Sequence, residues 1–590
     1  MSVTVHTPVK FYRMFVIVML IVLSVLVLVW RAFDLHILDH AFLKGQGDAR
    51  YLREVPIATH RGMITDRNGE PLAISTPVNS VWIYPKEFLT EQAQWPKLAK
   101  ILQIDVSLIT TLVMQRKHRD FVYLQRHIAP EVSQQIMALG LAGVSLQREY
   151  RRYYPAGEVA SHVIGFTNID DAGQEGLELA YDDWLKGTPG LKRVLKDRLG
   201  RVIKHVELID QPKPGKDLTL SIDRRLQYLT YRELKKAVHK HKAKSGSALI
   251  LDIKTGEVLA MVNQPSYNPN NRKKLKSNNF RNRAVTDIFE PGSTIKPFTM
   301  AAALESGSYR PSTKIDTSPG TLHVGNSVIH DHRNYGVMNL TRIIQKSSNV
   351  GMSKIALSIP ARQITRMHNN VGFGTSSHSG FPGEVNGFVN PITDKQEIER
   401  ATLSFGYGLS VTALQLARAY AVIGNEGKRV PVTFVRVDDD VPEKTVLTKN
   451  TSHQILTMME AVITKEGTGS LASIPGYRVA GKTGTVKKVA IGGYSEKKYI
   501  SIFAGIVPAS NPRMVMVVTV NEPSTGGYYG GEVAAPVFAK VMAGALRILD
   551  IAPDDINTNI KFSAKPVIAS TTSPEHSLTQ VNVTRMAGIQ

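Results

Sequence analysis

Ser293 and Lys296 form the first of three short motifs that could carry out chemistry. Pro291 and Gly292 stand directly before the serine, which is typical of the start of a helix. Residues three positions apart share one face of a helix, so the hydroxyl and the amine would lie together. A lysine that is partly removed from water loses its proton readily and then activates a serine hydroxyl as a base. The pair therefore predicts a serine nucleophile at a helix N-terminus, which favours the developing alkoxide.

Two more motifs follow along the chain. The Ser347–Asn349 stretch reads Ser-Ser-Asn, and its hydroxyl and amide, two residues apart, could relay a proton and orient a peptide substrate. The Lys482–Thr485 stretch reads Lys-Thr-Gly-Thr and lies in an expected strand, whose edge could pair with an extended peptide. Gly484 would allow that peptide to approach closely. Lys482 supplies a fixed positive charge, and a backbone N–H near Thr485 could supply half of an oxyanion hole.

Each motif on its own has little specificity. Ser-x-x-Lys should occur about twice by chance in a chain of this length, and it occurs again at Ser495. Lys-Thr-Gly recurs at Lys254, and Ser-x-Asn recurs at Ser277. Only the first set runs from a helix start, through a loop or helix end, to a strand within one domain. This order and setting favour a single active site built from all three motifs.

The elements that must position these residues indicate an α+β fold, with helices packed on a largely antiparallel sheet. Alternating apolar residues predict strands, and apolar residues at helical spacing predict helices. The expected elements are a helix from Arg224 to about His241, a hairpin of Ser247–Asp252 and Val258–Val262, strands Tyr477–Lys488, Tyr499–Val507 and Met514–Asn521, and a closing helix at about Ala534–Leu549.

The N-terminal segment predicts a membrane anchor. Met14 to Trp30 is apolar apart from Ser24, and about 17 helical residues span about 26 Å, near the lower limit for a bilayer core. Lys10 and Arg13 precede the segment, so the positive-inside rule favours a cytoplasmic N-terminus, with the rest of the chain outside the cytoplasm. No small-residue cleavage pattern follows, which indicates an uncleaved signal-anchor. A buried core helix is the alternative.

The composition narrows the class of partner. The 590 residues include 72 Lys and Arg and 50 Asp and Glu, which gives a formal net charge of +22. The absence of cysteine excludes disulfide scaffolds, thiolate metal sites and cysteine nucleophiles. The part of the chain that lies outside the cytoplasm is exposed to neither nucleic acid nor ATP, so we expect no nucleic-acid partner. The basic excess then indicates lipid headgroups or a cell-wall polymer.

Changes in composition divide the chain into expected segments. The pattern changes near Pro212–Gly215, and the residues after Asp550 are rich in Ser, Thr, Asn and Pro, which is typical of disorder. The expected segments are a cytoplasmic tail (1–12), a transmembrane anchor (13–30), a connector (31–55), a β-rich region (56–215), an α+β domain (216–553) and a disordered C-terminal tail (554–590).

The ordered motif set resembles that of penicillin-binding proteins and serine β-lactamases. Further segments outside the motifs also resemble these proteins, so the resemblance covers nearly the whole chain apart from the extreme N-terminus and the tail. It is greatest to the division-specific (septal) class B penicillin-binding proteins of Gram-negative bacteria. The resemblance implies that 56–215 is a non-catalytic pedestal and that 216–553 is a transpeptidase domain. The segments that carry it are Arg61–Gly69, Arg151–Pro155, Gly176–Glu178, Phe289–Pro297, Lys346–Val350 and Gly406–Ser410.

The resemblance also implies a role for each motif residue. Ser293 would attack the carbonyl of the penultimate D-Ala of a stem peptide and form an acyl-enzyme, with Lys296 as the general base. Ser347 and Asn349 would take part in proton transfer and substrate placement. The implied substrate-binding residues are Lys482, Thr483, Gly484 and Thr485, the first two on the substrate carboxylate. The implied oxyanion hole consists of the backbone N–H groups of Ser293 and Thr485, and the side chains that could line the cleft are Tyr407, Tyr528 and Tyr529.

The same resemblance implies a biological setting. An amine of a neighbouring stem peptide would take the acyl group, so the product would be a cross-link in septal cell wall, and β-lactams would acylate the same serine. Members of the family need no metal or cofactor. The implied partners are peptidoglycan stem peptides, a polytopic septal glycan polymerase and other division proteins. The implied location is the inner membrane at the division septum, with the catalytic domain in the periplasm.

Several other hypotheses fit parts of the sequence. Gly476–Thr483 matches the phosphate-binding loop pattern, but β-like residues follow where a helix is needed. His323, His330 and His332 with Asp331 could suggest a metal site, although their spacing matches no strong ligand pattern. A D,D-carboxypeptidase or a β-lactamase would share all three motifs. A catalytically silent division scaffold would use only the anchor and the pedestal.

Overall fold

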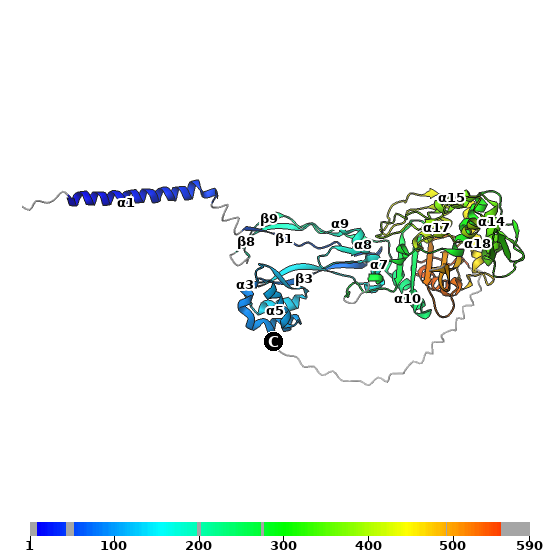
Figure 1. Ribbon diagram of the computed structural model, residues 1–590, viewed down its shortest axis with the longest axis horizontal. Coiled ribbons are helices and arrows are strands. Elements are labelled where there is room, and N and C mark those ends of the chain that lie inside the picture. Colours follow the sequence, from blue (N-terminus) through cyan, green and yellow to red (C-terminus); the bar gives the residue numbers. More distant parts are fainter. Residues whose placement is uncertain (1–8, 43–51, 197–201, 273–276, 491–492, 556–590) are drawn as a thin grey trace, which may run out of the picture.

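The structure is a computed structural model that describes residues 9–42, 52–196, 202–272, 277–490 and 493–555. Residues 1–8 of the expected cytoplasmic tail and 556–590 of the expected C-terminal tail lie outside these ranges. A β-rich region (52–219), blue to cyan in Figure 1, lies beside an α+β region (220–555), green to orange. The α+β class expected from the sequence is confirmed by this architecture.

The N-terminal helix α1 (Val9–Phe33) is apolar and exposed. It continues into a short π-helical turn, Asp34–Leu38. The segment Phe11–Leu38 is long enough and apolar enough to cross a membrane, and none of its most apolar part is buried against the rest of the chain. The expected span of 13–30 lies inside this helix. Apolar side chains that no other part of the chain covers are those that a bilayer would cover.

The β-rich region is built around the long strand β3 (Pro71–Ile83). Strand β5 (Val144–Tyr153) pairs with β3 over most of its length, and helices with apolar faces pack beside this sheet around Val81, Ile83 and Phe88. The other elements of this part are β2 (Ile64–Thr65), β4 (Val122–Ile128), β10 (Leu218–Thr219), α3 (Pro85–Phe88), α4 (Trp95–Leu102), α5 (Val106–Gln115) and α6 (Pro130–Ala138).

A second sheet of the β-rich region begins earlier than expected. Strand β1 (Leu52–Ile57) starts inside the segment expected to be a connector, because it pairs antiparallel with β8 (Gly190–Lys196), which in turn pairs with β9 (Val202–Asp210). The pairing partner lies more than 130 residues away along the chain, so local sequence carries no sign of it. The small elements between the two sheets are α7 (Ser161–Ile164), β6 (Phe166–Thr167), β7 (Gly173–Glu175), α8 (Gly176–Ala180) and α9 (Asp182–Leu185).

A buried ion-pair network holds these small elements. The Glu178 carboxylate lies 2.6 Å from Nε of Arg61 and 2.6 Å from Nε of Arg152, and none of the three side chains is more than 1% exposed. Arg61 also donates to Asp182. Buried charges are tolerated when each one is paired and hydrogen-bonded, as here. The network therefore ties the start of the β-rich region to β5 and α8.

The α+β region has a five-stranded antiparallel sheet in the order β12–β11–β23–β22–β21. Helices α10 and α20 cover one face, and α12, α17 and α18 cover the other. The expected hairpin and strands are present, but β22 starts six residues earlier than expected because it pairs with the far end of β21. The strands are β11 (Ser245–Asp252), β12 (Val258–Gln264), β21 (Ala480–Ala490), β22 (Gly493–Val507) and β23 (Met514–Asn521).

The remaining elements of the α+β region are mostly helices. The helices are α10 (Arg224–Lys240), α11 (Arg283–Thr286), α12 (Lys296–Glu305), α13 (Leu340–Lys346), α14 (Asn349–Ser358), α15 (Ala361–Val371), α16 (Glu397–Leu403), α17 (Ala413–Gly424), α18 (Lys449–Glu460), α19 (Gly530–Val533) and α20 (Ala535–Ile548). The short strands are β13 (Lys314–Asp316), β14 (Thr321–Val324), β15 (Ser327–His330), β16 (Val337–Asn339), β17 (Phe388–Val389), β18 (Leu409–Ser410), β19 (Lys428–Arg429) and β20 (Lys444–Thr445).

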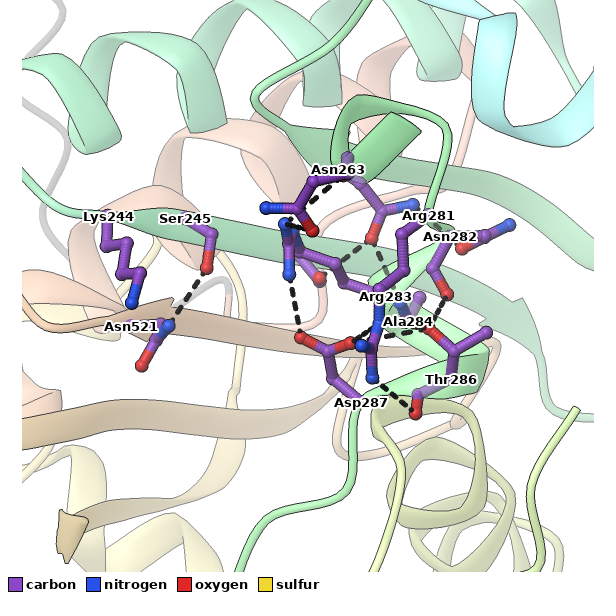
Figure 2. Close-up of polar contacts among 12 residues, drawn as sticks. Lys244, Ser245, Asn263, Arg281, Asn282, Arg283, Ala284, Thr286, Asp287 and Asn521 are labelled. Atoms are coloured by element: carbon purple, nitrogen blue, oxygen red, sulfur yellow. Dashed lines mark hydrogen bonds and ion pairs between the residues drawn. The ribbon is translucent and has the colours of Figure 1, made fainter. Parts of the chain in front are cut away.

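A network of polar contacts fixes the segment that leads to Ser293 (Figure 2). The buried Asn263, on β12, accepts from the backbone N–H of Ala284 at 2.9 Å and donates to Asn282 at 2.8 Å. Arg281 and Arg283 both pair with Asp287 in the same turn. The sheet therefore determines where α11 lies, and with it the start of the chain that carries the nucleophile.

Replacing Glu178 by Gln would leave the guanidinium groups of Arg61 and Arg152 buried without a carboxylate. Breaking a buried ion pair from one side costs about 3–5 kcal/mol. We expect the free energy of unfolding of the β-rich region to fall by that amount, measured by urea denaturation followed by circular dichroism. Glu207→Gln breaks the exposed pair with Arg193 and should cost less than about 1 kcal/mol. Equal losses in the two variants would contradict this account.

Candidate active site

Ser293 lies in a tight turn that continues into a buried helix. The turn η5 (Gly292–Ile295) is a 3-10 helix, and α12 follows it directly, so the expected helix start has a tighter first turn than an α-helix. Gly292 has φ +52°, and a Cβ there would fall 2.6 Å from Cγ2 of Val486. Ser293 is partly exposed, and its hydroxyl makes no hydrogen bond to any described residue. That hydroxyl is therefore open to a ligand.

Lys296 points away from solvent and toward the second motif. Its side chain is completely buried, and Nζ lies 2.5 Å from the carbonyl oxygen of Ser347, 2.8 Å from Oδ1 of Asn349 and 3.1 Å from Oγ of Ser347. Burial lowers the pKa of Lys296 well below its usual value, and the charge of Lys482 lowers it further. A neutral amine has two N–H groups for the two carbonyl-type oxygens, which leaves its lone pair free to accept a proton.

The Ser347–Asn349 motif lies at a sharp change of direction between α13 and α14. Ser347 adopts the left-handed conformation at φ +58° and ends α13. Ser348 then caps α14, because its hydroxyl accepts from the backbone N–H of Gly351 at 2.8 Å. The turn leaves Ser347 and Asn349 on the same side, facing Lys296. The middle residue of the motif thus has a structural contact, which sequence analysis did not assign to it.

Asp331 is a residue of the site that sequence analysis did not assign to it. Oδ1 accepts from the backbone N–H groups of Asn349 at 2.5 Å and Val350 at 3.0 Å, and Oδ2 accepts from the Ser348 hydroxyl at 2.5 Å. A carboxylate at a helix N-terminus accepts hydrogen bonds from the free N–H groups there, and its negative charge interacts favourably with the helix dipole. In the sequence, Asp331 stands in a histidine-rich stretch that could suggest a metal site, and its spacing from the motif gives no signal of this contact.

Lys482 connects the third motif to the second through a direct hydrogen bond. It lies on β21, the edge strand of the sheet, and it is completely buried. Nζ donates to Oγ of Ser347 at 2.9 Å and to the carbonyl oxygen of Thr483 at 3.2 Å. Burial lowers the pKa of Lys482 to about 7. The Ser347 hydroxyl is therefore shared by two lysines from different motifs.

The other residues of the third motif connect β21 to its neighbours. Oγ1 of Thr483 lies 2.8 Å from Oγ1 of Thr468, and Oγ1 of Thr485 accepts from the backbone N–H of Gly530 at 3.0 Å. A Cβ at Gly484 would fall 3.0 Å from the carbonyl oxygen of Pro291, so β21 and the nucleophile turn are in close contact. The close approach of Pro291 is thus a second reason for glycine at this position, besides the expected approach of a peptide.

The three expected cleft tyrosines belong to two aromatic groups. Tyr407 packs perpendicular to Tyr494 with ring centroids 5.4 Å apart, and the Tyr494 hydroxyl donates to Glu290 at 3.0 Å. Tyr528 stacks on Tyr499 with centroids 4.2 Å apart, and Tyr529 packs against both Tyr528 and His332. Tyr494 and Tyr499 on β22 and Glu290, just before the nucleophile turn, are aromatic and acidic neighbours that sequence analysis did not select.

Two rival hypotheses do not fit the structure. The phosphate-binding loop pattern ends in β21, and the antiparallel strand β22 follows instead of a helix. Among the described residues no group of three or more His, Asp and Glu side chains is arranged to hold a metal ion. In the histidine-rich loop, the carbonyl of His330 accepts from Asn349 at 3.1 Å. These residues therefore support the Ser347–Asn349 motif.

Comparisons with known proteins agree with this geometry. A family model described as "Penicillin-binding Protein dimerisation domain" matches residues 56–220, and one described as "Penicillin binding protein transpeptidase domain" matches residues 246–543. The chain is 44% identical to "Peptidoglycan D,D-transpeptidase FtsI" of Escherichia coli K12, over 92% of this chain and 92% of that protein. It is 42% identical to "Probable peptidoglycan D,D-transpeptidase PbpC" of Pseudomonas aeruginosa, over 92% and 96%.

Solved structures are similar as well. The transpeptidase domain of penicillin-binding protein 3 from Burkholderia pseudomallei is 41% identical with a TM-score of 0.53, covering 57% of this chain and 97% of that one. Penicillin-binding protein 3 from Mycobacterium tuberculosis, complexed with aztreonam, is 26% identical with a TM-score of 0.66, covering 85% and 98%. Since both domain models match in tandem and the relatives align over nearly their whole length, the chain belongs to the family of penicillin-binding proteins that join a dimerisation domain to a transpeptidase domain.

Proposed function

We propose that this protein is a serine-type peptidoglycan D,D-transpeptidase that forms septal cross-links during division, and that β-lactams acylate it. The observation that carries the proposal is the shared hydroxyl of Ser347, which lies at hydrogen-bond distance from the amines of both Lys296 and Lys482. Such a chain can move a proton without a metal or a cofactor. Relatives named peptidoglycan D,D-transpeptidase support the reaction class.

Acylation begins at Ser293. Its oxygen attacks the carbonyl carbon of the penultimate D-Ala, and its proton passes to Nζ of Lys296. The backbone N–H groups of Ser293 and Thr485 receive the negative charge that develops on the carbonyl oxygen. When the C–N bond breaks, the proton moves through the Ser347 hydroxyl to the nitrogen of the departing D-Ala. An ester between Ser293 and the stem peptide remains.

Transfer then regenerates the serine. An amine of a second stem peptide attacks the ester carbonyl, its excess proton returns to the Ser293 oxygen, and the product is an amide cross-link. Before acylation, Lys482 and Thr483 hold the carboxylate of the terminal D-Ala of the donor peptide, and the edge of β21 pairs with the donor backbone. Asn349 and Gly484 position the peptide, and the Tyr407 and Tyr528–Tyr529 groups line the cleft. Hydrolysis by water instead of an amine would make the protein a D,D-carboxypeptidase.

The location and partners follow from the anchor. We place α1 in the inner membrane with its N-terminus in the cytoplasm, because Lys10 and Arg13 precede the apolar segment. The rest of the chain then lies in the periplasm, at the division septum. A polytopic glycan polymerase and other division proteins are the partners, and the anchor and the β-rich region provide surfaces for them. The family likeness and the exposed apolar helix support this placement.

A single penicillin adduct on Ser293 tests the proposed activity. The full-length protein in detergent should gain one stable adduct on incubation with benzylpenicillin, detected by intact-mass spectrometry. Ser293→Ala should gain none, because the attacking oxygen is absent. Ser495→Ala, which alters the second Ser-x-x-Lys match, should acylate like the wild type. A folded wild-type protein without an adduct would favour the catalytically silent scaffold, and rapid loss of the adduct would favour a β-lactamase.

The rate of acylation should have a bell-shaped dependence on pH. Lys296 must be neutral to accept a proton, whereas Lys482 must be protonated to hold a carboxylate. Since the pKa of Lys482 is about 7 in the free protein, its charge is lost as the pH rises through that value. We therefore expect the second-order rate constant for a fluorescent penicillin, measured from roughly pH 5 to 9, to fall on the alkaline side from about pH 7.

Lys482→Arg is the informative variant for this profile. Arginine stays protonated over the whole range, so the alkaline decline should disappear even if the rate at every pH is lower. A decline that stays at the same pH in Lys482→Arg would assign it to another group.

Asp331 should act by positioning the Ser347–Asn349 motif. Asp331→Ala removes three hydrogen bonds to the start of α14, so we expect acylation to slow by about 10- to 100-fold, as the loss of charge-assisted hydrogen bonds predicts. Asp331→Asn keeps an acceptor for the two N–H groups and should recover most of the rate. The measurement is the acylation rate with the fluorescent penicillin.

Asp394→Ala is a matched control for Asp331→Ala. Asp394 accepts from the backbone N–H of Ala361 at the start of α15 at 2.7 Å, so its loss affects a similar helix start outside the site. Thermal stability should decline in both alanine variants, but only Asp331→Ala should acylate slowly. Slow acylation in both would show a general effect of stability.

A further inference from the structure

A cavity lies among elements that carry none of the three motifs. It has a volume of about 590 Å³ and is bounded by the C-terminal end of α15, the loop 372–387, α17, β19 and β20. Helices α15 and α17 are neighbours in the α+β region (Figure 1). A volume of this size lies within the range of about 300–1,000 Å³ that small-ligand sites occupy. The charged side chains of its lining are Arg418, Arg429, Glu443 and Lys444.

Arg418 is a buried cation that forms no ion pair with any residue the structure describes. Its side chain projects from α17, and the residue is 6% exposed. The guanidinium donates to the backbone carbonyls of Gly372, Ser376 and Thr375, and its Nε–H has no partner among the described residues. Burial lowers the pKa of Arg418 to about 10, so the group stays charged at neutral pH. The charge of Glu384 raises the pKa of Arg418, but Arg418 forms no ion pair with any described carboxylate, so its buried charge is poorly compensated.

Ser377 adds an unused hydrogen-bonding group to the same wall. The residue is 5% exposed, and its hydroxyl has no hydrogen-bond partner in the described part of the chain. Its backbone N–H donates to Glu384, which also accepts from the N–H and hydroxyl of Ser379. The Glu384 carboxylate is therefore occupied by the loop itself. Buried hydroxyls are normally hydrogen-bonded, so this one lacks a partner that a ligand could supply.

The charge that remains in the cavity is positive. Glu443 pairs with Lys428 at 2.6 Å, so the lysine largely neutralises the negative charge that Glu443 would add to the cavity. Among the described residues, the side chain of Arg429 donates only to the carbonyl of Asn370, at 2.8 Å. Lys444 makes no ion pair with any described residue. Two guanidinium groups and one amine thus border the cavity, and Glu443, the carboxylate among the described lining residues, is paired with Lys428.

We propose that this cavity binds an oxyanion, the carboxylate or phosphate group of a small ligand, between Arg418, Arg429 and Ser377. Guanidinium N–H groups form charge-assisted hydrogen bonds with such oxygens. The Nε–H of Arg418 and the Ser377 hydroxyl have no partner among the described residues, and Arg429 supplies further N–H donors. None of the lining residues belongs to the three motifs, so the site is separate from the Ser293 cleft. The proposal does not depend on the transpeptidase reaction.

Direct titration tests the proposal on the full-length protein in detergent. The protein is first acylated with benzylpenicillin, so that Lys482 no longer attracts free carboxylates. Isothermal titration calorimetry then uses inorganic pyrophosphate in one arm and citrate in the other. We expect saturable binding of about one equivalent in at least one arm, and the tighter arm identifies phosphate or carboxylate as the ligand group. No saturable binding in either arm would overturn the proposal.

Two variants locate the binding site. Ser377→Ala removes a hydroxyl that has no partner, so the protein should fold normally, and Arg429→Gln removes a charge at the border of the cavity. Both should weaken binding, Arg429→Gln by about tenfold or more, as expected for the loss of a charge-assisted hydrogen bond. Lys540→Gln, an exposed lysine on α20, makes the same change of charge elsewhere and should bind like the wild type. Equal affinity in all three variants would overturn the proposal.

Discussion

Two buried lysines share one serine hydroxyl, and the rest of the site depends on this arrangement. Nζ of Lys296 lies 3.1 Å and Nζ of Lys482 lies 2.9 Å from Oγ of Ser347, so the two nitrogens are at most about 6 Å apart. Two positive charges at that distance repel by about 3 kcal/mol at an effective dielectric constant near 20. Burial adds a penalty for each charge. One lysine is therefore neutral near neutral pH. Burial and the charge of Lys482 both lower the pKa of Lys296, which favours Lys296 as the neutral one.

The shared hydroxyl requires three chain segments to approach closely, and glycine makes the approach possible. A Cβ at Gly406 would fall 2.1 Å from the carbonyl oxygen of Gly292, and one at Gly484 would fall 3.0 Å from that of Pro291. The nucleophile turn is thus held between the loop after α16 and the edge strand β21. The backbone of Thr294 is held from a further side, because its carbonyl accepts from the buried Tyr420 hydroxyl at 2.8 Å.

The β-rich region contacts the segment that leads to this turn. The Asn270 side chain accepts from the N–H of Tyr154 at 3.0 Å and donates to its carbonyl at 2.9 Å. The buried His162 lies 2.9 Å from the carbonyl of Asn279, and its own carbonyl accepts from Asn282. Asn282 is also bound to Asn263 on the sheet. One residue therefore connects the β-rich region, the sheet and the chain that enters the active site.

The sequence by itself determined the fold class, the expected anchor and the three motifs, because these depend on local periodicity and on residue type. The helix that follows Asp223 and the strands after Ala480 could be predicted in this way, apart from a few residues at their ends. Strand β1 could not, because its partner β8 lies far along the chain. The contacts of Nζ of Lys296 with Ser347 and Asn349 could not be predicted either, because those residues lie about 50 positions further along the chain.

Only the tertiary structure decided which atoms meet. Asp331 and Ser348 carry no local sign of their contact, since a loop carboxylate and a helix start are brought together by the packing of α14. The lowered pKa of Lys482 likewise arises from burial, which depends on every element that covers β21. Residue types can state that a lysine is able to lose its proton. Only the packed fold removes the water that would otherwise keep it charged.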